Sequence, residues 1–227
     1  SHQLAHEYFG APQDEENFNA WEEEYLLDDT VLPNEDLSTD EIREACRSLK
    51  GVMLRQEIYS DDSSEKASIP YTITEQNFTI KCLQKQKANK HAIFFSHSRE
   101  VINYHYERNI SDPRIQHVMS LDVDKYGNIL KSLAIGYGRK QSQSSLQGED
   151  KQKQEQILIT FTENDFTNAI DNHNTYPDDY RTPLPAEERT YEITGFTPDL
   201  ITNRFVFTDI SADNITVLLN LSDAQYE

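Results

Sequence analysis

One acidic stretch of the chain has the spacing of a metal-binding loop. Asp122, Asp124 and Gly127 match the first half of a calcium loop of the form D-x-D-x-x-G. Such a loop needs a bidentate glutamate at its twelfth position, and that position holds Leu133. The flanking residues also alternate like strands, whereas a calcium loop of this class joins two helices. The sequence therefore favours a hairpin turn here over a calcium site.

Four histidines lie on segments that we expect to be neighbouring strands: His91, His97, His105 and His117. A three-histidine metal site is geometrically conceivable on such strands, because the imidazole ring is a common metal ligand. The spacing does not specify a site, however, and histidines within strands usually belong to the scaffold. We therefore predict no metal ligands, and no motif in the sequence implies a cofactor.

Nucleophilic catalysis finds no support in the sequence. No serine lies in a G-x-S-x-G elbow, and neither Cys46 nor Cys82 has a recognisable catalytic signature. Two thiols make neither a disulfide framework nor a zinc site, so both are predicted to be reduced structural cysteines. The segments 96–98 and 22–24 do not meet the order or context that an ADP-ribosyltransferase requires. We predict no catalytic residues and a protein that is not an enzyme.

Processing signals give little information. Four asparagines match the N-x-[ST] pattern of glycosylation acceptors: Asn77, Asn109, Asn214 and Asn220. This pattern is too common to imply glycosylation without a secretory signal. The chain starts at Ser1-His2 without an initiator methionine, and we expect it to be an excerpt of a larger protein.

Charge limits the partners of this chain. Its 227 residues include 40 acidic and 21 basic side chains, which give a net charge of −19. Fourteen of the carboxylates lie between Glu7 and Glu44, where the only Lys or Arg is Arg43. This excess would repel phosphates, so we predict no nucleic acid and no anionic membrane as partner. The sequence contains no run of roughly 18 apolar residues, so we expect no segment to insert into a membrane.

The centre of the chain alternates between apolar and polar residues on both sides of a turn-forming stretch, Asp124–Asn128. Gly127 and Asn128 tolerate the positive φ that a reversing chain needs. This pattern predicts a long antiparallel β-hairpin with one buried face, preceded by a strand over 101–108. The residues expected on the buried face are Ile115, His117, Met119, Leu121, Val123, Ile129, Leu133, Ile135 and Tyr137.

Residues 39–50 have the signals of one capped α-helix. Ser38 is the expected N-cap, and Glu41 completes a capping box. Gly51 supplies the C-terminal stop. The expected buried stripe of this helix consists of Ile42, Ala45, Cys46 and Leu49.

The other segments are less regular. The acidic lead-in, 1–37, includes a short helix with Phe18, Trp21 and Tyr25 on one face, which we expect to lie across the sheet. The polar stretch 141–156 is predicted to be a flexible surface loop because it can bury nothing. Further strands are expected over 52–59, 69–83 with a bulge near 75–77, 157–161, 190–193 and 205–207, with an irregular segment over 166–185.

A set of motifs is distinctive as a group. They are SLKG at 48–51, LRQEIY at 54–59, IPYTITEQN at 69–77, YHYERN-x-x-DPR at 104–114, D-x-YGN-x-LK at 124–131, IGY at 135–137 and YRTPLP at 180–185. In this order the chain resembles the middle-to-C-terminal region of the B component of insecticidal toxin complexes, the TcdB/TcaC type. The resemblance covers roughly residues 38–195.

The resemblance implies a structural role. In that family the B and C components form a hollow shell of long strands, related to Rhs repeats, which encloses the cytotoxic part of the C component. A propeller elsewhere in the B component docks onto the translocating A component. We therefore expect a mainly β fold in which long antiparallel hairpins form a twisted open sheet or shell segment. Its partners would be the C component, the remaining B-component shell and, indirectly, the A component, all secreted as a toxin complex.

The domain organisation follows from the same reading. Residues 1–227 are expected to form a single β-rich segment of a larger shell-forming protein. Within it, 1–37 is the lead-in, 38–140 the helix and main meander, 141–156 the loop, and 157–227 further strands with the irregular segment.

Two other functions are compatible with these residues. A carbohydrate- or receptor-binding β module would use Trp21 and the 12 tyrosines as stacking platforms. A hydrolase would have its site in the irregular segment 166–185. Long amphipathic strands without a catalytic constellation favour the structural segment.

Overall fold

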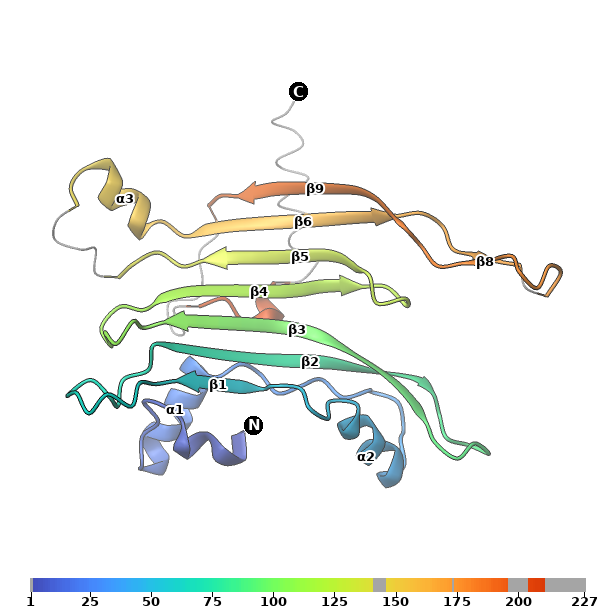
Figure 1. Cartoon of the computed structure of the whole chain (residues 1–227), viewed down its shortest axis with the longest axis horizontal. Coiled ribbons are helices and arrows are strands. Elements are labelled where there is room, and N and C mark those ends of the chain that lie inside the picture. Colours follow the sequence, from blue (N-terminus) through green and yellow to red (C-terminus); the bar gives the residue numbers. More distant parts are fainter. Residues whose placement is uncertain (1, 141–145, 173, 196–203, 211–227) are drawn as a thin grey trace.

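Seven strands of the computed structural model form one antiparallel sheet (Figure 1). The structure describes every residue except 1, 141–145, 173, 196–203 and 211–227. The sheet order is β1-β2-β3-β4-β5-β6-β9, and a separate two-stranded ribbon, β7–β8, precedes β9. The strands are β1 (Arg55–Ile58), β2 (Thr72–Gln84), β3 (Ile93–His105), β4 (Arg114–Val123), β5 (Ile129–Gly136), β6 (Leu158–Phe166), β7 (Ile170–Asp171), β8 (Tyr180–Arg181) and β9 (Pro185–Ile193).

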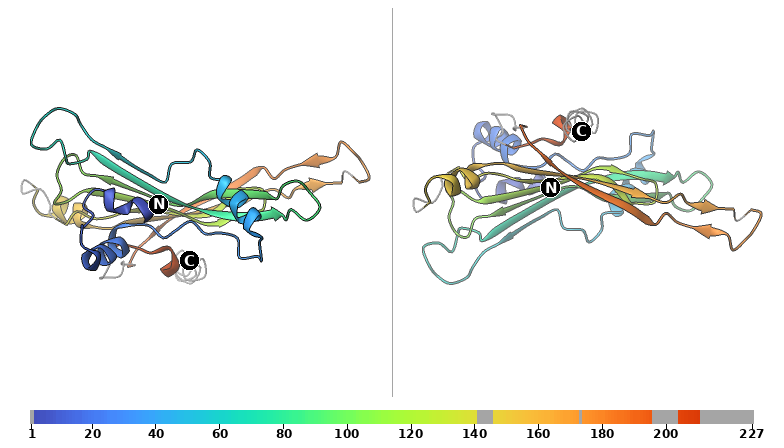
Figure 2. Two further views of the ribbon diagram at one scale, coloured as in Figure 1. Left: turned by 90° about the horizontal axis from the view of Figure 1, so that it is seen from below. Right: turned by 90° about the horizontal axis from the view of Figure 1, so that it is seen from above.

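Two helices lie against one face of this twisted sheet, and α2 and α3 lie at its two ends. Figure 2 shows α1 and η2 on the same side, which we call the covered face, and we call the other side the open face. The covered face carries Ile102, His117 and Ile135, which are direct neighbours across β3, β4 and β5. No helix of the described residues has the length and apolar character to cross a membrane. The helices are η1 (His2–Glu7), α1 (Glu15–Tyr25), α2 (Thr39–Arg47), α3 (Glu149–Glu155) and η2 (Phe207–Asp209).

The predicted mainly β fold and its central hairpin are confirmed, but Ile129, which was expected on the buried face, is exposed at the start of β5. Strands β4 and β5 pair antiparallel, with His117 opposite Ile135 and Met119 opposite Leu133. The turn between them is closed by Asp124, whose Oδ1 accepts hydrogen bonds from the backbone N–H groups of Tyr126 and Asn128. Asp124 therefore serves the turn, as expected for a hairpin rather than a calcium loop.

The core of the protein lies between the covered face and the two chain segments that cross it. Leu27 follows α1 and packs on β2 and β3. Phe205 and Ile210 pack on the strands from β4 to β9. Each of these three residues is at most 2% exposed. Most of the stabilisation of a sheet with one covered face comes from burial of this kind.

The expected bulge on the second strand is present as a register shift at Asn77/Phe78. Asn77 lies opposite Glu100 and Phe78 lies opposite Ser98, so the extra residue is Arg99 of β3. A bulge places two successive side chains near one side of the sheet. Arg99 and Glu100 are accordingly both buried, and the Arg99 guanidinium lies 4.1 Å from the centre of the Phe207 ring.

The capped helix is confirmed at its start, whereas its buried stripe was wrongly predicted. Ser38 and Glu41 form the capping box, but Ile42 and Cys46 are exposed and only Ala45 of the stripe is fully buried. The helix packs against the end of the β2–β3 hairpin, where Glu41 Oε1 accepts a hydrogen bond from Gln86 N. Glu41 is therefore buried in place of Ile42.

Other segments differ from the expectation as well. The stretch predicted as a flexible loop contains α3, which buries no side chain and is supported by the i,i+4 ion pairs Lys153–Glu149 and Lys151–Glu155. The strand expected over 205–207 is wrong, because the chain turns into η2 while Phe205 fills the core. The strand expected from 190 begins earlier, at Pro185, because the residues before it pair with β6.

Most remaining elements are present with other boundaries: the strand expected over 101–108 is Ile93–His105, and the strand expected over 157–161 continues to Phe166. The strand expected over 52–59 is shorter, since only Arg55–Ile58 pairs with β2. The irregular segment 166–185 includes the β7–β8 ribbon, which extends beyond the sheet in Figure 1. The apolar tail over 214–226 lies outside the described residues.

Candidate functional site

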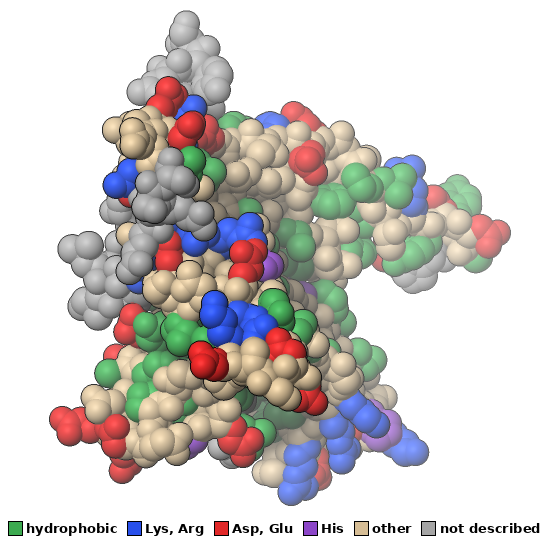
Figure 3. Space-filling model, turned by 60° about the vertical axis from the view of Figure 1, so that its left-hand side comes forward, with side chains coloured by type: hydrophobic (Ala, Val, Ile, Leu, Met, Phe, Trp, Pro, Cys, Tyr) green, Lys and Arg blue, Asp and Glu red, His purple; other side chains and the backbone are tan. Residues whose placement is uncertain are grey.

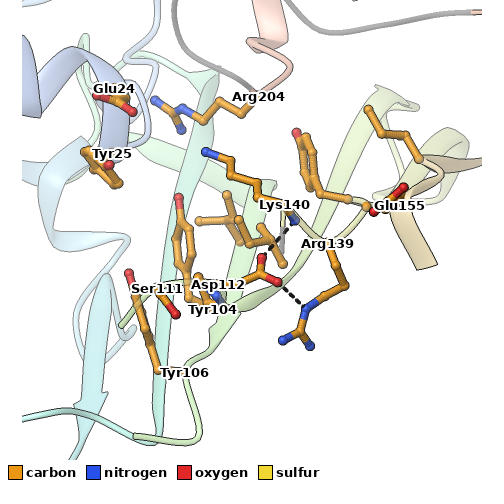
Figure 4. Close-up of a pocket in the computed structure, with 16 residues that line it drawn as sticks. Glu24, Tyr25, Tyr104, Tyr106, Ser111, Asp112, Arg139, Lys140, Glu155 and Arg204 are labelled. Carbon is orange, nitrogen blue, oxygen red and sulfur yellow. Dashed lines mark hydrogen bonds and ion pairs between the residues drawn. The ribbon is translucent and has the colours of Figure 1, made fainter. Parts of the chain in front are cut away.

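A pocket of about 330 Å³ lies on the covered face, between α1 and the ends of β3 and β5 (Figure 4). We call it the tyrosine pocket because Tyr25, Tyr104, Tyr106 and Tyr137 line it. These tyrosines come from α1, from the end of β3 and from the residue that follows β5. Three segments that are distant in the sequence therefore meet in one cavity, and only the folded sheet brings them together.

Two charged side chains are anchored at the edge of this pocket. Asp112, which is 5% exposed, accepts hydrogen bonds from Arg139 Nε at 2.9 Å and from Lys140 N at 3.0 Å. Arg204, which is 8% exposed, donates to the carbonyl oxygens of Leu26 and Glu23. Both groups hold backbone in place, so the wall of the pocket is preformed.

The phenols of the pocket differ in their partners. The Tyr137 oxygen accepts a hydrogen bond from Phe205 N at 2.9 Å and lies 3.2 Å from His117 Nδ1. Tyr104 is only 7% exposed, and its hydroxyl has no hydrogen-bond partner among the described residues. Figure 4 shows the Tyr104 side chain pointing towards Lys140 and Arg204.

Burial keeps these phenols protonated. It raises the pKa of Tyr104 well above the usual value and raises the pKa values of Tyr106 and Tyr137 to about 12. The cause is loss of solvation of the phenolate. At neutral pH these hydroxyls therefore remain able to donate a hydrogen bond.

A buried polar network adjoins the pocket at the centre of the covered face. Glu100 Oε2 lies 3.2 Å from His117 Nε2, and Glu100 Oε1 accepts from Asn77 Nδ2 at 2.9 Å. Burial lowers the pKa of His117. Burial by itself would raise the pKa of Glu100, but hydrogen bonds from His117 and Asn77 lower it. Through Tyr137 the network reaches the backbone of Phe205, so it links the sheet to the segment that covers it.

A second polar cluster holds the lead-in on the sheet. Arg55 forms ion pairs with Glu57, at 2.8 Å, and with Glu75. The carboxylates in turn accept backbone hydrogen bonds: Glu57 from Phe9 N at 3.1 Å and Glu75 from Leu27 N at 3.0 Å. These charged groups thus fix the path of the lead-in on the sheet.

The structure does not gather the four histidines into one site. His91 Nδ1 lies 2.6 Å from Glu44, His117 pairs with Glu100, and His97 Nδ1 lies 3.1 Å from the Ser98 carbonyl oxygen. No group of three His, Cys, Asp or Glu side chains with metal-binding geometry is found within the described part of the chain.

One glycosylation motif is inaccessible in this fold. Asn77 is 3% exposed and its amide donates to Glu100 and to the Asp28 carbonyl oxygen. Asn109 is exposed in the β3–β4 connection, and the motifs at 214 and 220 lie outside the described residues.

Sequence reasoning placed His117 on the buried face but missed the carboxylates beside it. Glu75 and Glu100 could have been found, because each stands two residues from a buried isoleucine of the same strand, Ile73 or Ile102. No comparable signal marks Asp112 or Arg204, whose positions depend on loops that pack only in the tertiary structure.

A comparison with protein families adds to this geometry. Residues 44–176 match the family model described as the insecticide toxin TcdB middle/C-terminal region. The chain belongs to this family. The TcdB match covers more than half of the chain and includes strands β1 to β7. A comparison with curated protein sequences gave no match.

Solved structures of TcdB complexes share the fold. A crystal structure of TcdB2–TccC3 without the hypervariable C-terminal region has a TM-score of 0.64 at 24% identity over 84% of this chain and 9% of that chain. A crystal structure of TcdB2–TccC3 has a TM-score of 0.59 at 27% identity, and the match covers 77% of this chain and 10% of that chain. The structure of the Photorhabdus luminescens Tc holotoxin pore with the TccC3 mutation D651A has a TM-score of 0.57 at 26% identity. This match covers 77% of this chain and 9% of that chain. The chain thus spans about a tenth of the length of the solved chains it matches.

Proposed function

We propose that this chain is a non-catalytic structural segment of a toxin-complex B component. In this role it contributes to the β-rich shell that the B and C components form around a cytotoxic polypeptide before delivery. Membership of the TcdB family supports the proposal, and so do solved relatives that are complexes of TcdB2 with TccC3. The partners would be the C component and the rest of the B component, with indirect contact to the A component, in a secreted complex.

The observation that carries this proposal is the difference between the two edges of the sheet. At one edge β1 is only four residues long, and Val31 extends the pairing by bridging to Thr79. At the other edge β9 is nine residues long and pairs with β6 on one side only. No strand of the described residues lies on its outer side. A long unpaired edge of this kind pairs readily with another strand.

The buried ionisable groups support a non-catalytic role. Glu57, Glu75 and Asp112 each accept a hydrogen bond from a backbone N–H of a distant segment. Charges used in this way are satisfied within the fold. We also propose that residues 1–227 act as one segment, because the lead-in is tied to the sheet through Phe9 and Leu27.

Hydrogen exchange on two chains tests the proposal. This chain would be compared with the full-length B component, alone and bound to the C component. We expect the amides of β9 to exchange more slowly in the longer protein, because the outer edge is then paired. Strand β4 is the control, since it has a partner on both sides already. Equal exchange of the β9 amides in all three samples would show that the outer edge of β9 does not pair with another strand of the shell.

A further inference from the structure

We propose that the tyrosine pocket is a binding site for a neutral saccharide, such as a hexose unit of a glycan. This inference does not depend on the shell proposal, because it concerns a cavity on the covered face and not the edge of the sheet. It rests on three properties of the pocket: a preformed wall, a tyrosine hydroxyl that is open to the cavity and a balance of charge.

The wall of the pocket is held by the protein itself. Asp112 is fixed by Arg139 and by Lys140 N, and Arg204 is fixed by two carbonyl oxygens at the end of α1. A ligand therefore meets polar groups that are already oriented, which lowers the entropy lost on binding.

The Tyr104 hydroxyl is the group that points to a ligand. Tyr104 is more than nine-tenths buried, lines the pocket and has no hydrogen-bond partner among the described residues. The hydroxyl oxygen itself is open to the pocket, so a ligand group can replace the water that solvates it. A ligand hydroxyl could form a hydrogen bond with the Tyr104 hydroxyl in either direction, since each group can donate and accept.

The balance of charge in the pocket favours a neutral ligand. Among the described residues, three carboxylates and three cationic side chains line the pocket, and their formal charges cancel although the chain as a whole carries −19. In Figure 3, which turns the end of the sheet with α3 towards the viewer, acidic and basic side chains lie next to one another at this end, whereas a group of basic side chains gathers at the lower right. A phosphate or carboxylate ligand would need a surplus of positive charge that this end of the molecule lacks. The six charged residues are Glu24, Asp112, Glu155, Arg139, Lys140 and Arg204.

The rest of the lining suits the C–H faces of a sugar ring. Ile102, Ile115 and Ile157 provide apolar surface beside the phenol rings. The rings of Tyr104 and Tyr106 are already stacked on each other, with centroids 6.1 Å apart. A flat base or indole therefore has no slot between them, whereas a puckered ring with hydroxyls at its edge can use both the apolar surface and the Tyr104 hydroxyl.

Titration of this chain with uncharged methyl glycosides tests the assignment. The probes are the methyl glycosides of glucose, galactose, mannose, fucose and N-acetylglucosamine, observed by saturation-transfer NMR and calorimetry. We expect at least one to bind, and we expect glucuronate and glucosamine to bind no more tightly than methyl glucoside. Lactose and diacetylchitobiose form a second arm: tighter binding of a disaccharide assigns the site to a longer glycan, and equal binding assigns it to a single sugar unit.

Two variants connect binding to the pocket. Tyr104→Phe removes only the hydroxyl, and we expect a loss of affinity of about fivefold to tenfold, the range of one net hydrogen bond. Tyr25→Phe, at a half-exposed position of the same pocket, keeps the test usable if Tyr104→Phe unfolds. The matched control is Tyr126→Phe, in the turn at the other end of β4. Absence of binding by every neutral glycoside, preference for a charged probe, or equal affinity of Tyr104→Phe and Tyr126→Phe would each overturn the proposal.

Discussion

His117 Nε2 lies 3.2 Å from Glu100 Oε2 at the centre of the covered face, and the two side chains are 0% and 3% exposed. Glu100 stands in β3 beside the extra residue Arg99, and His117 stands in β4. The titratable and charged groups that act on His117 are Glu100, Tyr137 and Arg204. The pair therefore joins two central strands to the segment that crosses them, and several of its properties can be measured.

Acid should destabilise the fold through His117. Its pKa is lowered by burial, so the unfolded chain binds the proton more readily than the folded chain. The contribution of neutral His117 to stability is then fully present above the pKa of the unfolded chain, about 6.5. It is lost as the pH falls towards the lower pKa of the folded chain. The pKa of Glu100 is lowered in the folded chain, so protonation of this carboxylate at lower pH also reduces stability. We expect the free energy of unfolding to fall by roughly 1–2 kcal/mol between about pH 7.5 and about pH 5.

Urea unfolding at several pH values checks this expectation. His117→Gln removes the titrating group and should flatten the dependence on pH over this range. His105→Gln, at a partly exposed position at the end of β3, is the control and should keep the slope of the natural chain. An unchanged slope in His117→Gln would mean that another group is responsible.

The β4–β5 turn depends on glycine at position 127. Gly127 has φ +88°, and a Cβ there would approach the Phe95 ring to 3.0 Å. We expect Gly127→Val to destabilise the protein by roughly 1–2 kcal/mol, since a β-branched residue is strained in this conformation. Gly136→Ala is the control, because its φ is not in the left-handed region and nothing lies within 4 Å of the added carbon. A thermal melt in which Gly127→Val matches Gly136→Ala would contradict the turn geometry.

A smaller effect is expected at the neighbouring position. The Asn128 side chain donates to Asp124 Oδ2 at 2.9 Å, whereas its backbone bond to Asp124 Oδ1 does not depend on residue type. Asn128→Ala should therefore lower stability by about 1 kcal/mol or less, the net value of one hydrogen bond. The same series of thermal melts measures this loss of stability. A larger loss for Asn128→Ala than for Gly127→Val would mean that Asn128, and not Gly127, is the more important residue of the turn.

The capping box of α2 should contribute to stability although the helix packs at the edge of the protein. Ser38 Oγ accepts from Glu41 N, and Glu41 Oε2 accepts from Ser38 N. Ser38→Ala removes the cap, and we expect a loss of about 1 kcal/mol in chemical denaturation. Asp40→Ala, which breaks only an exposed ion pair with Arg43, should have little effect. If both variants unfold at the same denaturant concentration, the cap has no energetic role.

The free edge at β9 should make this chain associate with itself as salt rises. Strand β9 is nine residues long and has no partner on its outer side among the described strands, which favours strand pairing between molecules. The net charge of −19 opposes that contact, and salt screens the repulsion beyond about 8–10 Å. We expect light scattering to report growing particles from low to high salt. A longer chain that includes the flanking strands of the B component should stay unchanged, and a strictly monomeric short chain would favour a self-contained binding module.

Local patterns in the sequence determined the elements of this protein. The alternation on both sides of Asp124–Asn128 predicted β4 and β5, and the Ser38–Glu41 spacing predicted the start of α2. Such signals arise from contacts between residues that are close in the chain, so they can be interpreted without the fold. The same applies to the turn residue Gly127 and to the ordered motifs that resemble the TcdB family.

Only the tertiary structure decided which surfaces of those elements are buried and what they enclose. Ile42 is exposed and Glu41 buried because α2 packs on the β2–β3 hairpin, a contact between residues about 45 positions apart. The tyrosine pocket unites Tyr25, Tyr104 and Arg204 because α1 and the segment near η2 cross the same face of the sheet. Contacts of this range depend on how the strands are ordered and twisted, and neither composition nor periodicity specifies that arrangement.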